Sequence, residues 1–157
     1  MAFLEALGLS KESDSFAGRK RIHKTVYLLK TLGADLRFGY SWYWHGPYSP
    51  NLTRTLLEPS SKEEQSRREL TRSELEIVNV LRNFLGNDFY SVDSLELIVS
   101  LIYLIKHGPK EGYDTKDKIL EFLQQKKPRF STDQVEDAWN KVERAGVVDR
   151  HIAMLKR

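Results

Sequence analysis

The chain has 157 residues, a formal net charge of +3 and a mean hydropathy of -0.51, with 40% hydrophobic and 30% charged residues. This length and balance predict a single soluble domain spanning residues 1–157. The sequence contains no cysteine, which excludes disulfides, thiol nucleophiles and cysteine-based zinc sites and suits a reducing cytoplasm, to which we assign the protein.

The N-terminal residues predict a short helix, a loop and then a long helix. Residues 1–15 lack the basic segment and the long apolar core of a secretory signal. We therefore expect a short helix over residues 3–9 and a loop over residues 11–15. A strong helix is predicted over residues 19–32, because Gly33 stands where glycine commonly ends a helix.

Helix 19–32 has two contrasting faces. The apolar face is expected to point into the core and comprises Ile22, Thr25, Val26, Leu28, Leu29 and Leu32. The polar face comprises Arg19, Lys20, His23, Lys24, Tyr27 and Lys30. We interpret the polar face as solvent-exposed, since such faces usually are, and contact with phosphate groups is the alternative. Residues 1–58 hold eight Lys/Arg and five Asp/Glu, which suits an acidic protein or nucleic-acid partner.

Residues 37–45 alternate with the two-residue period of a β-strand. One face is aromatic and comprises Phe38, Tyr40, Trp42 and Trp44. We expect this face to pack against helices, and a platform for stacking bases is the alternative. Gly46 and Pro47 are expected to break the strand.

Three side chains near this strand have no structural need that the sequence reveals. They are Tyr43 and His45 on the opposite strand face and Tyr48 at the turn. We therefore expect any binding surface to lie where these three residues meet the basic face of helix 19–32.

The next segments predict a capped helix and an exposed link. Ser49 is expected to cap a helix that begins at Pro50 and ends before Pro59. Its core-facing residues would be Leu52, Leu56 and Leu57. Residues 60–70 are charged and poor in apolar side chains, so we expect an exposed link between an N-terminal part, 1–59, and a helical part, 71–157.

The helical part 71–157 is predicted to contain four helices. The first starts with a capping box of Thr71 and Glu74 and runs to residue 85, and Ser91 or Ser94 caps the second. The second is apolar nearly all round, which is typical of a helix in a core or in a homo-oligomer interface. Its apolar run, 95–105, is shorter than the roughly 20 residues that span a bilayer, so no membrane contact is expected.

The last two helices are predicted over residues 115–125 and, from a capping box of Ser131 and Gln134, over residues 131–146. Residues 147–155 would form a short strand or a frayed tail. The inward side chains of the first and last helices are expected to be Leu75, Val78, Leu81, Leu85, Val135, Ala138, Trp139, Val142 and Ala145. The predicted fold class is therefore mainly α (α+β), with about seven helices and a small two- or three-stranded winged-helix-like β element.

The order of a basic helix, an aromatic strand and the sequence HGPYSPNL resembles the YwgA-like family of small prokaryotic proteins. It is also similar to the wider Panacea domain of SocA-type antitoxins. The resemblance covers about residues 15–60 and is carried by Lys20, Ile22, Lys24, Val26, Tyr27, Leu28, His45, Gly46, Pro47, Tyr48, Ser49 and Leu52. It departs from the family pattern in the His45–Gly46 pair, where Tyr or Trp commonly precedes the glycine. The resemblance implies a protein-binding role of antitoxin or adaptor type and brings no catalytic residue.

No complete catalytic, metal or cofactor motif appears. The histidines His23, His45, His107 and His151 show no metal-ligand spacing, and no glycine-rich phosphate loop is present. We expect a non-enzymatic module without cofactor that binds a protein partner. Two alternatives remain open: a winged-helix-like nucleic-acid-binding regulator and a hydrolase centred on His45.

Overall fold

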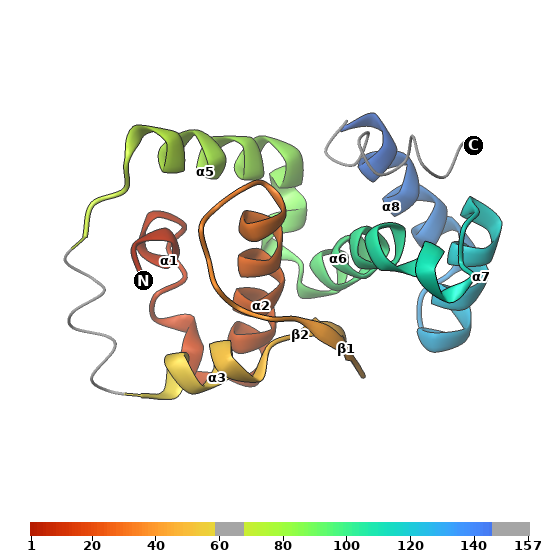
Figure 1. Cartoon of the computed structure of the whole chain (residues 1–157), viewed down its shortest axis with the longest axis horizontal. Helices are drawn as coiled ribbons and strands as arrows, with labels where there is room; N and C mark the ends of the chain where they lie inside the picture. The colour runs from red at the N-terminus through yellow and green to blue at the C-terminus, as the bar shows by residue number, and fades with distance from the viewer. Residues whose placement is uncertain (59–67, 146–157) are drawn as a thin grey trace. The chain divides into compact units, whose positions relative to one another are not determined.

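The computed structural model of the protein describes residues 1–58 and 68–145 (Figure 1). Within these residues the fold is mainly α, with seven α-helices and one two-stranded antiparallel sheet, which confirms the predicted class. The chain divides into two compact units, Met1–Leu95 and Glu96–Arg157. Most of the predicted link (60–67) and the predicted strand or tail (147–155) lie outside the described residues.

The first unit contains most of the predicted elements of the N-terminal half and one helix beyond the link. Its elements are α1 (Ala2–Ala6), the 3-10 helix η1 (Glu12–Asp14), α2 (Phe16–Thr31), β1 (Ser41–Tyr43), β2 (Gly46–Tyr48), α3 (Pro50–Leu57), α5 (Arg72–Leu85) and the 3-10 helix η2 (Gly86–Tyr90). Helix α2 contacts η1, β2 and α5 (Figure 1). It is the element around which this unit packs.

Helix α2 begins before the predicted start at residue 19. The Ser15 side chain accepts a hydrogen bond from the Gly18 N–H at 2.9 Å, which caps the helix at Phe16. Gly18 is therefore inside the helix, where a Cβ atom would collide with the Glu12 carbonyl of η1. The glycine serves a close approach of two backbones rather than a helix boundary.

The prediction of a solvated polar face on α2 is wrong for its central turns. Every residue from 22 to 29 is buried, including His23, Lys24 and Tyr27. Strand β2 and the beginning of α3 supply hydrogen-bond partners for the His23 and Lys24 side chains, which offset the cost of removing them from water. Arg19 and Lys20 are partly buried, and only Lys30 of that face is exposed.

The predicted strand over residues 37–45 is shorter than expected. It is confined to Ser41–Tyr43, which pairs with Gly46–Tyr48 across a two-residue turn. Gly46 takes a φ of 83°, in the left-handed region that favours glycine. Gly46 and Pro47 thus form the partner strand rather than a break, and Trp44 in the turn is 93% exposed instead of buried.

Local capping rules set the ends of α3 and α5. Ser49 caps α3 with Pro50 in its first turn, and Thr71 forms the predicted capping box with Glu74. Two inward assignments are wrong, because Leu57 is 60% and Leu75 47% exposed. Leu57 is the last residue of α3, and Leu75 lies in the first turn of α5.

The second unit consists of the remaining helices, α6 (Val92–His107), η3 (Gly108–Glu111), α7 (Lys116–Lys126) and α8 (Thr132–Arg144), with the unit boundary falling inside α6. Ser91 rather than Ser94 caps α6, since the Ser91 hydroxyl accepts from the Ser94 N–H at 3.1 Å. The predicted box of Ser131 and Gln134 caps α8. Ala145, predicted to face inward, is exposed just beyond the end of α8.

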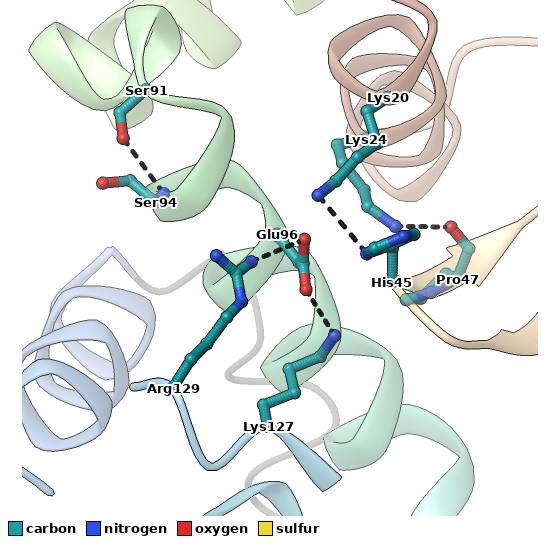
Figure 2. A network of polar contacts seen from close by, with 9 residues as sticks. All are labelled: Lys20, Lys24, His45, Pro47, Ser91, Ser94, Glu96, Lys127 and Arg129. Atoms are coloured by element: carbon teal, nitrogen blue, oxygen red, sulfur yellow. Dashed lines mark hydrogen bonds and ion pairs between the residues drawn. The ribbon is translucent and has the colours of Figure 1, made fainter. Parts of the chain in front are cut away.

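A buried ion cluster joins α6 to the segment between α7 and α8. Glu96 is 1% exposed and accepts from Lys127 Nζ at 2.6 Å, and Lys127 is 3% exposed (Figure 2). Arg129 forms a second ion pair with Glu96 at 2.9 Å.

In the part of the chain that the structure describes, no helix is long and apolar enough to cross a membrane.

Candidate functional site

A pocket of about 380 Å³ lies between the N-terminal half of α2 and the β1–β2 hairpin. We call it the α2–hairpin pocket. All of its lining belongs to the unit Met1–Leu95. The lining residues are Phe16, Arg19, Lys20, His23, Lys24, Tyr43, Trp44, His45, Gly46, Tyr48 and Thr53.

One wall of the pocket is basic. Lys20 Nζ donates to His45 Nδ1 at 3.4 Å, and Lys24 Nζ donates to the Pro47 carbonyl at 2.8 Å (Figure 2). Arg19 Nη1 donates to the Ser13 carbonyl at 2.9 Å. None of the described residues that line the pocket is an aspartate or glutamate. The pocket therefore carries a positive charge on α2 next to an aromatic hairpin.

The floor of the pocket is a hydrogen-bonded polar cluster around the ring of His23. His23 Nδ1 lies 3.3 Å from the Ser49 backbone N–H, and Nε2 lies 2.9 Å from Thr53 Oγ1. Thr53 Oγ1 is in turn 2.6 Å from the Tyr48 hydroxyl, and the Tyr48 ring stacks on His23 with centroids 4.5 Å apart. Because a backbone N–H can only donate, Nδ1 is the acceptor and the neutral ring carries its proton on Nε2.

The environment keeps His23 neutral. Burial, with smaller contributions from the charges of Lys24 and Arg19, lowers the pKa of His23 from its ordinary value to about 4. With its proton on Nε2, His23 donates to Thr53 and does not remove a proton from it. The arrangement therefore fixes α3 and the hairpin to α2, and it does not activate the Thr53 hydroxyl as a nucleophile.

Tyr40 and Tyr27 pack beside this cluster. The Tyr40 hydroxyl donates to the His23 carbonyl at 3.1 Å, and the two tyrosine rings meet edge to face at 5.1 Å. Burial, with a smaller contribution from Tyr27, raises the pKa of Tyr40 far above its usual range. Tyr40 is thus a neutral hydrogen-bond donor that supports α2.

The rim of the pocket is aromatic and exposed. Trp44 is 93%, Phe16 63% and Tyr43 47% exposed, although all three have large hydrophobic side chains. Phe16 meets His45 edge to face at 5.7 Å, and Tyr43 meets Tyr48 at 5.1 Å. These contacts leave much of each rim side chain accessible at the mouth of the pocket.

The predicted site residues gather at this pocket with two exceptions. Arg19, Lys20, His23, Lys24, Tyr43, His45 and Tyr48 all line it. Tyr27 packs against Tyr40 instead, and Lys30 Nζ donates to the Phe38 carbonyl at 2.6 Å.

The sequence patterns do not place Phe16, Trp44 or Thr53 at the site. Phe16 precedes the predicted start of the helix, and the period of the strand placed Trp44 on a buried face. Thr53 carried a weak signal, because it lies one helical turn beyond Ser49 on a helix whose apolar side chains point elsewhere.

Among residues 1–58 and 68–145, no group of three or more His, Asp or Glu side chains is arranged to hold a metal ion. The comparisons with known proteins found no matching family model, curated protein or solved structure.

Proposed function

We propose that the protein is a non-enzymatic binding module that engages a protein partner through the α2–hairpin pocket. The observation that carries this proposal is the rim of exposed aromatic side chains, Phe16, Tyr43 and Trp44, around a basic pocket. Aromatic and arginine side chains grouped at a concavity are the usual anchors of protein interfaces. We assign this activity to the cytoplasm, in keeping with the cysteine-free sequence.

The resemblance to YwgA-like proteins and Panacea domains supports an antitoxin or adaptor role. Its two halves, the basic helix and the HGPYS element, contact each other in the fold. Lys20 meets His45, Lys24 meets the Pro47 carbonyl, and Ser49 caps α3 while its N–H donates to the ring of His23. The two sequence signatures therefore form one structure in this unit.

The two alternative functions have less support. A helix that reads a DNA groove needs an exposed face, whereas residues 22–29 of α2 are all buried. For a hydrolase centred on His45, the Nδ1 atom of that ring already accepts from Lys20, and none of the described lining residues is a carboxylate that could orient the ring. The geometry suits recognition better than proton transfer.

Affinity capture from native extract with matched variants tests the proposal. We expect one specific protein to be retained by the wild type and lost with Trp44→Ser, since removing a central aromatic anchor commonly costs about 2 kcal/mol or more, roughly thirtyfold in Kd. Tyr90→Ser is the matched control, because Tyr90 is 72% exposed but lies outside the pocket.

The captured protein is then purified and its Kd measured for the three chains by titration calorimetry. A partner that binds wild type and Trp44→Ser equally well would refute the pocket as the interface. Retention of nucleic acid alone, sensitive to salt, would replace the proposal with the nucleic-acid alternative.

A further inference from the structure

We propose that the α2–hairpin pocket binds a backbone carbonyl of the partner protein through the Tyr48 hydroxyl, with an apolar side chain of the same segment against Phe16 and Tyr43. This inference rests on the proposed function and adds the chemistry by which the partner is recognised. The polar cluster on the pocket floor holds one donor proton more than its own acceptors take up, and that proton selects the carbonyl.

The direction of the hydrogen bonds in this cluster is set at His23. Its Nδ1 atom accepts from the Ser49 backbone N–H at 3.3 Å, so the proton of the neutral ring is on Nε2. Nε2 therefore donates to Thr53 Oγ1, which lies 2.9 Å away. Thr53 is thus an acceptor in this contact, and its own hydroxyl proton remains to be placed.

Thr53 and Tyr48 share the next hydrogen bond. Their hydroxyl oxygens are 2.6 Å apart, a distance that one proton bridges. Each hydroxyl carries one proton, so one of the two protons lies outside this contact. Among residues 1–58 and 68–145, no other side-chain or backbone group accepts from either hydroxyl. One donor is therefore available to a ligand.

We assign this donor to Tyr48. If Thr53 donates to Tyr48, each group in the chain from His23 passes a proton to the next, and such chains strengthen each of their hydrogen bonds. The opposite order makes the Thr53 oxygen accept twice and leaves the Tyr48 oxygen without a donor. The phenolic hydroxyl thus ends the chain with its proton directed away from Thr53.

The other polar side chains of the lining are more fully engaged within the protein. Lys20 donates to His45, and Lys24 donates to the Pro47 carbonyl. All three of these side chains also take part in further interactions. A hydroxyl proton rather than a charged group is consequently what the pocket offers for hydrogen bonding, and its complement is an oxygen acceptor.

The size and the rim of the pocket indicate that this acceptor belongs to a larger ligand. A pocket of about 380 Å³ falls in the range of sites that hold a small molecule or a few side chains. Phe16 is 63% and Tyr43 47% exposed at its mouth. A peptide segment, in which each backbone carbonyl adjoins a side chain, can fill the polar floor and the apolar rim together.

Nucleobases also combine carbonyl groups with flat apolar faces, but the surrounding surface favours a peptide. A nucleic-acid site usually follows several successive phosphates with a basic groove. On α2, Arg21 pairs with Glu12 at 2.9 Å, Lys30 donates to the Phe38 carbonyl, and residues 22–29 are buried. These groups are directed into the unit rather than along a phosphate chain.

Replacing single oxygen atoms in a small probe tests the inference. The probe is N-acetylphenylalanine N-methylamide, and each of its two carbonyls is converted in turn to a thiocarbonyl, which accepts hydrogen bonds weakly. Binding to the full chain is measured from backbone amide NMR shifts. We expect the probe to shift the signals of Gly46 and Tyr48, and one of the two thiocarbonyl forms to bind about fivefold more weakly, as expected for one lost hydrogen bond.

Matched variants decide whether the Tyr48 hydroxyl is responsible. Tyr48→Phe keeps the ring that stacks on His23 and should abolish the difference between the carbonyl and thiocarbonyl forms. Tyr43→Phe is the control, since Tyr43 also lines the pocket but lies outside the hydrogen-bonded chain, and it should leave the difference unchanged. The amide spectra of the variants without probe report whether each has kept the fold.

The inference is overturned if the probe causes no shifts, if both thiocarbonyl forms bind as tightly as the parent, or if the difference survives Tyr48→Phe. Loss of the difference in Arg19→Gln but not in Tyr48→Phe would assign the carbonyl to the guanidinium and overturn it as well. Uridine that binds more tightly than the probe, with the same dependence on Tyr48, would replace the peptide with a nucleobase. A captured partner that depends on Trp44 but not on the Tyr48 hydroxyl would leave the proposed function standing while refuting the carbonyl contact.

Discussion

Removing the titratable ring of His23 should change how stability depends on pH. In the folded state burial and the nearby Lys24 and Arg19 charges lower the pKa of His23 from 6.5 to about 4. At pH values between about 4 and 6.5, His23 is protonated in the unfolded chain and neutral in the folded chain. Stability therefore rises with pH across this window and is lost as pH falls from about 6.5 through 4.

The size of this loss of stability follows from the shift in the pKa of His23. A difference of about 2.5 pKa units, at about 1.36 kcal/mol per unit, corresponds to roughly 3 kcal/mol lost below pH 4. Lowering the pH from 7 to 5 covers most of this range and should cost about 2 kcal/mol through His23 alone. Such a loss is a large share of the free energy of unfolding of a typical domain.

Urea denaturation of the wild type and His23→Gln at pH 7 and pH 5 measures this contribution. Glutamine can still donate to Thr53 but does not titrate, so the change in unfolding free energy with pH should be about 2 kcal/mol smaller in the variant. Groups that titrate equally in both chains cancel in this difference. Equal pH dependence of the two chains would refute the lowered pKa of His23, and nitrogen chemical shifts of His23 would report the tautomer directly.

Three further substitutions test the packing. Glu96→Gln removes the carboxylate beside the buried Lys127 ammonium and should destabilise the chain by about 3–5 kcal/mol in urea denaturation. Glu136→Gln, in a half-exposed ion pair, should cost under about 1 kcal/mol, and similar losses for the two variants would contradict the buried Glu96–Lys127 pair. Gly18→Ala should cost about 1–3 kcal/mol and lower the thermal midpoint, because its Cβ meets backbone, while Gly39→Ala, with open space, should be nearly neutral. Ser49→Ala should cost about 1 kcal/mol through the lost cap of α3, measured by the same denaturation, and no change would show that the cap is dispensable.

Helix starts were predictable because their signals are local. Ser49 with Pro50, and the capping boxes that begin at Thr71 and Ser131, each depend on residues within one turn of the helix. The apolar character of α6 likewise needs no distant partner to be recognised. The mainly α class followed from these local patterns.

The burial of His23 and Lys24 could not be predicted, because it depends on distant residues. On a helical wheel both belong to the polar face, and their partners Thr53 and Pro47 come from elements 30 and 23 positions later. A pattern of polarity does not reveal that another element will supply acceptors for a lysine. The exposure of Trp44 also depends on a contact between separate segments. Because Tyr43 pairs with Gly46, the turn begins directly after Tyr43 and contains Trp44.

The spacing of the motif residues nevertheless accounts for the site. Lys20 and Lys24 are four residues apart on α2, a rise of about 6 Å along a helix axis. Their partners are the His45 ring in the turn and the Pro47 carbonyl in β2, two residues apart on the hairpin. The helix and the hairpin can therefore run side by side with both contacts in register. A shift of either lysine by one position would rotate its side chain by about 100° around the helix and break the match with its partner on the hairpin. The spacing that holds the hairpin on α2 therefore also positions the basic wall opposite the aromatic rim.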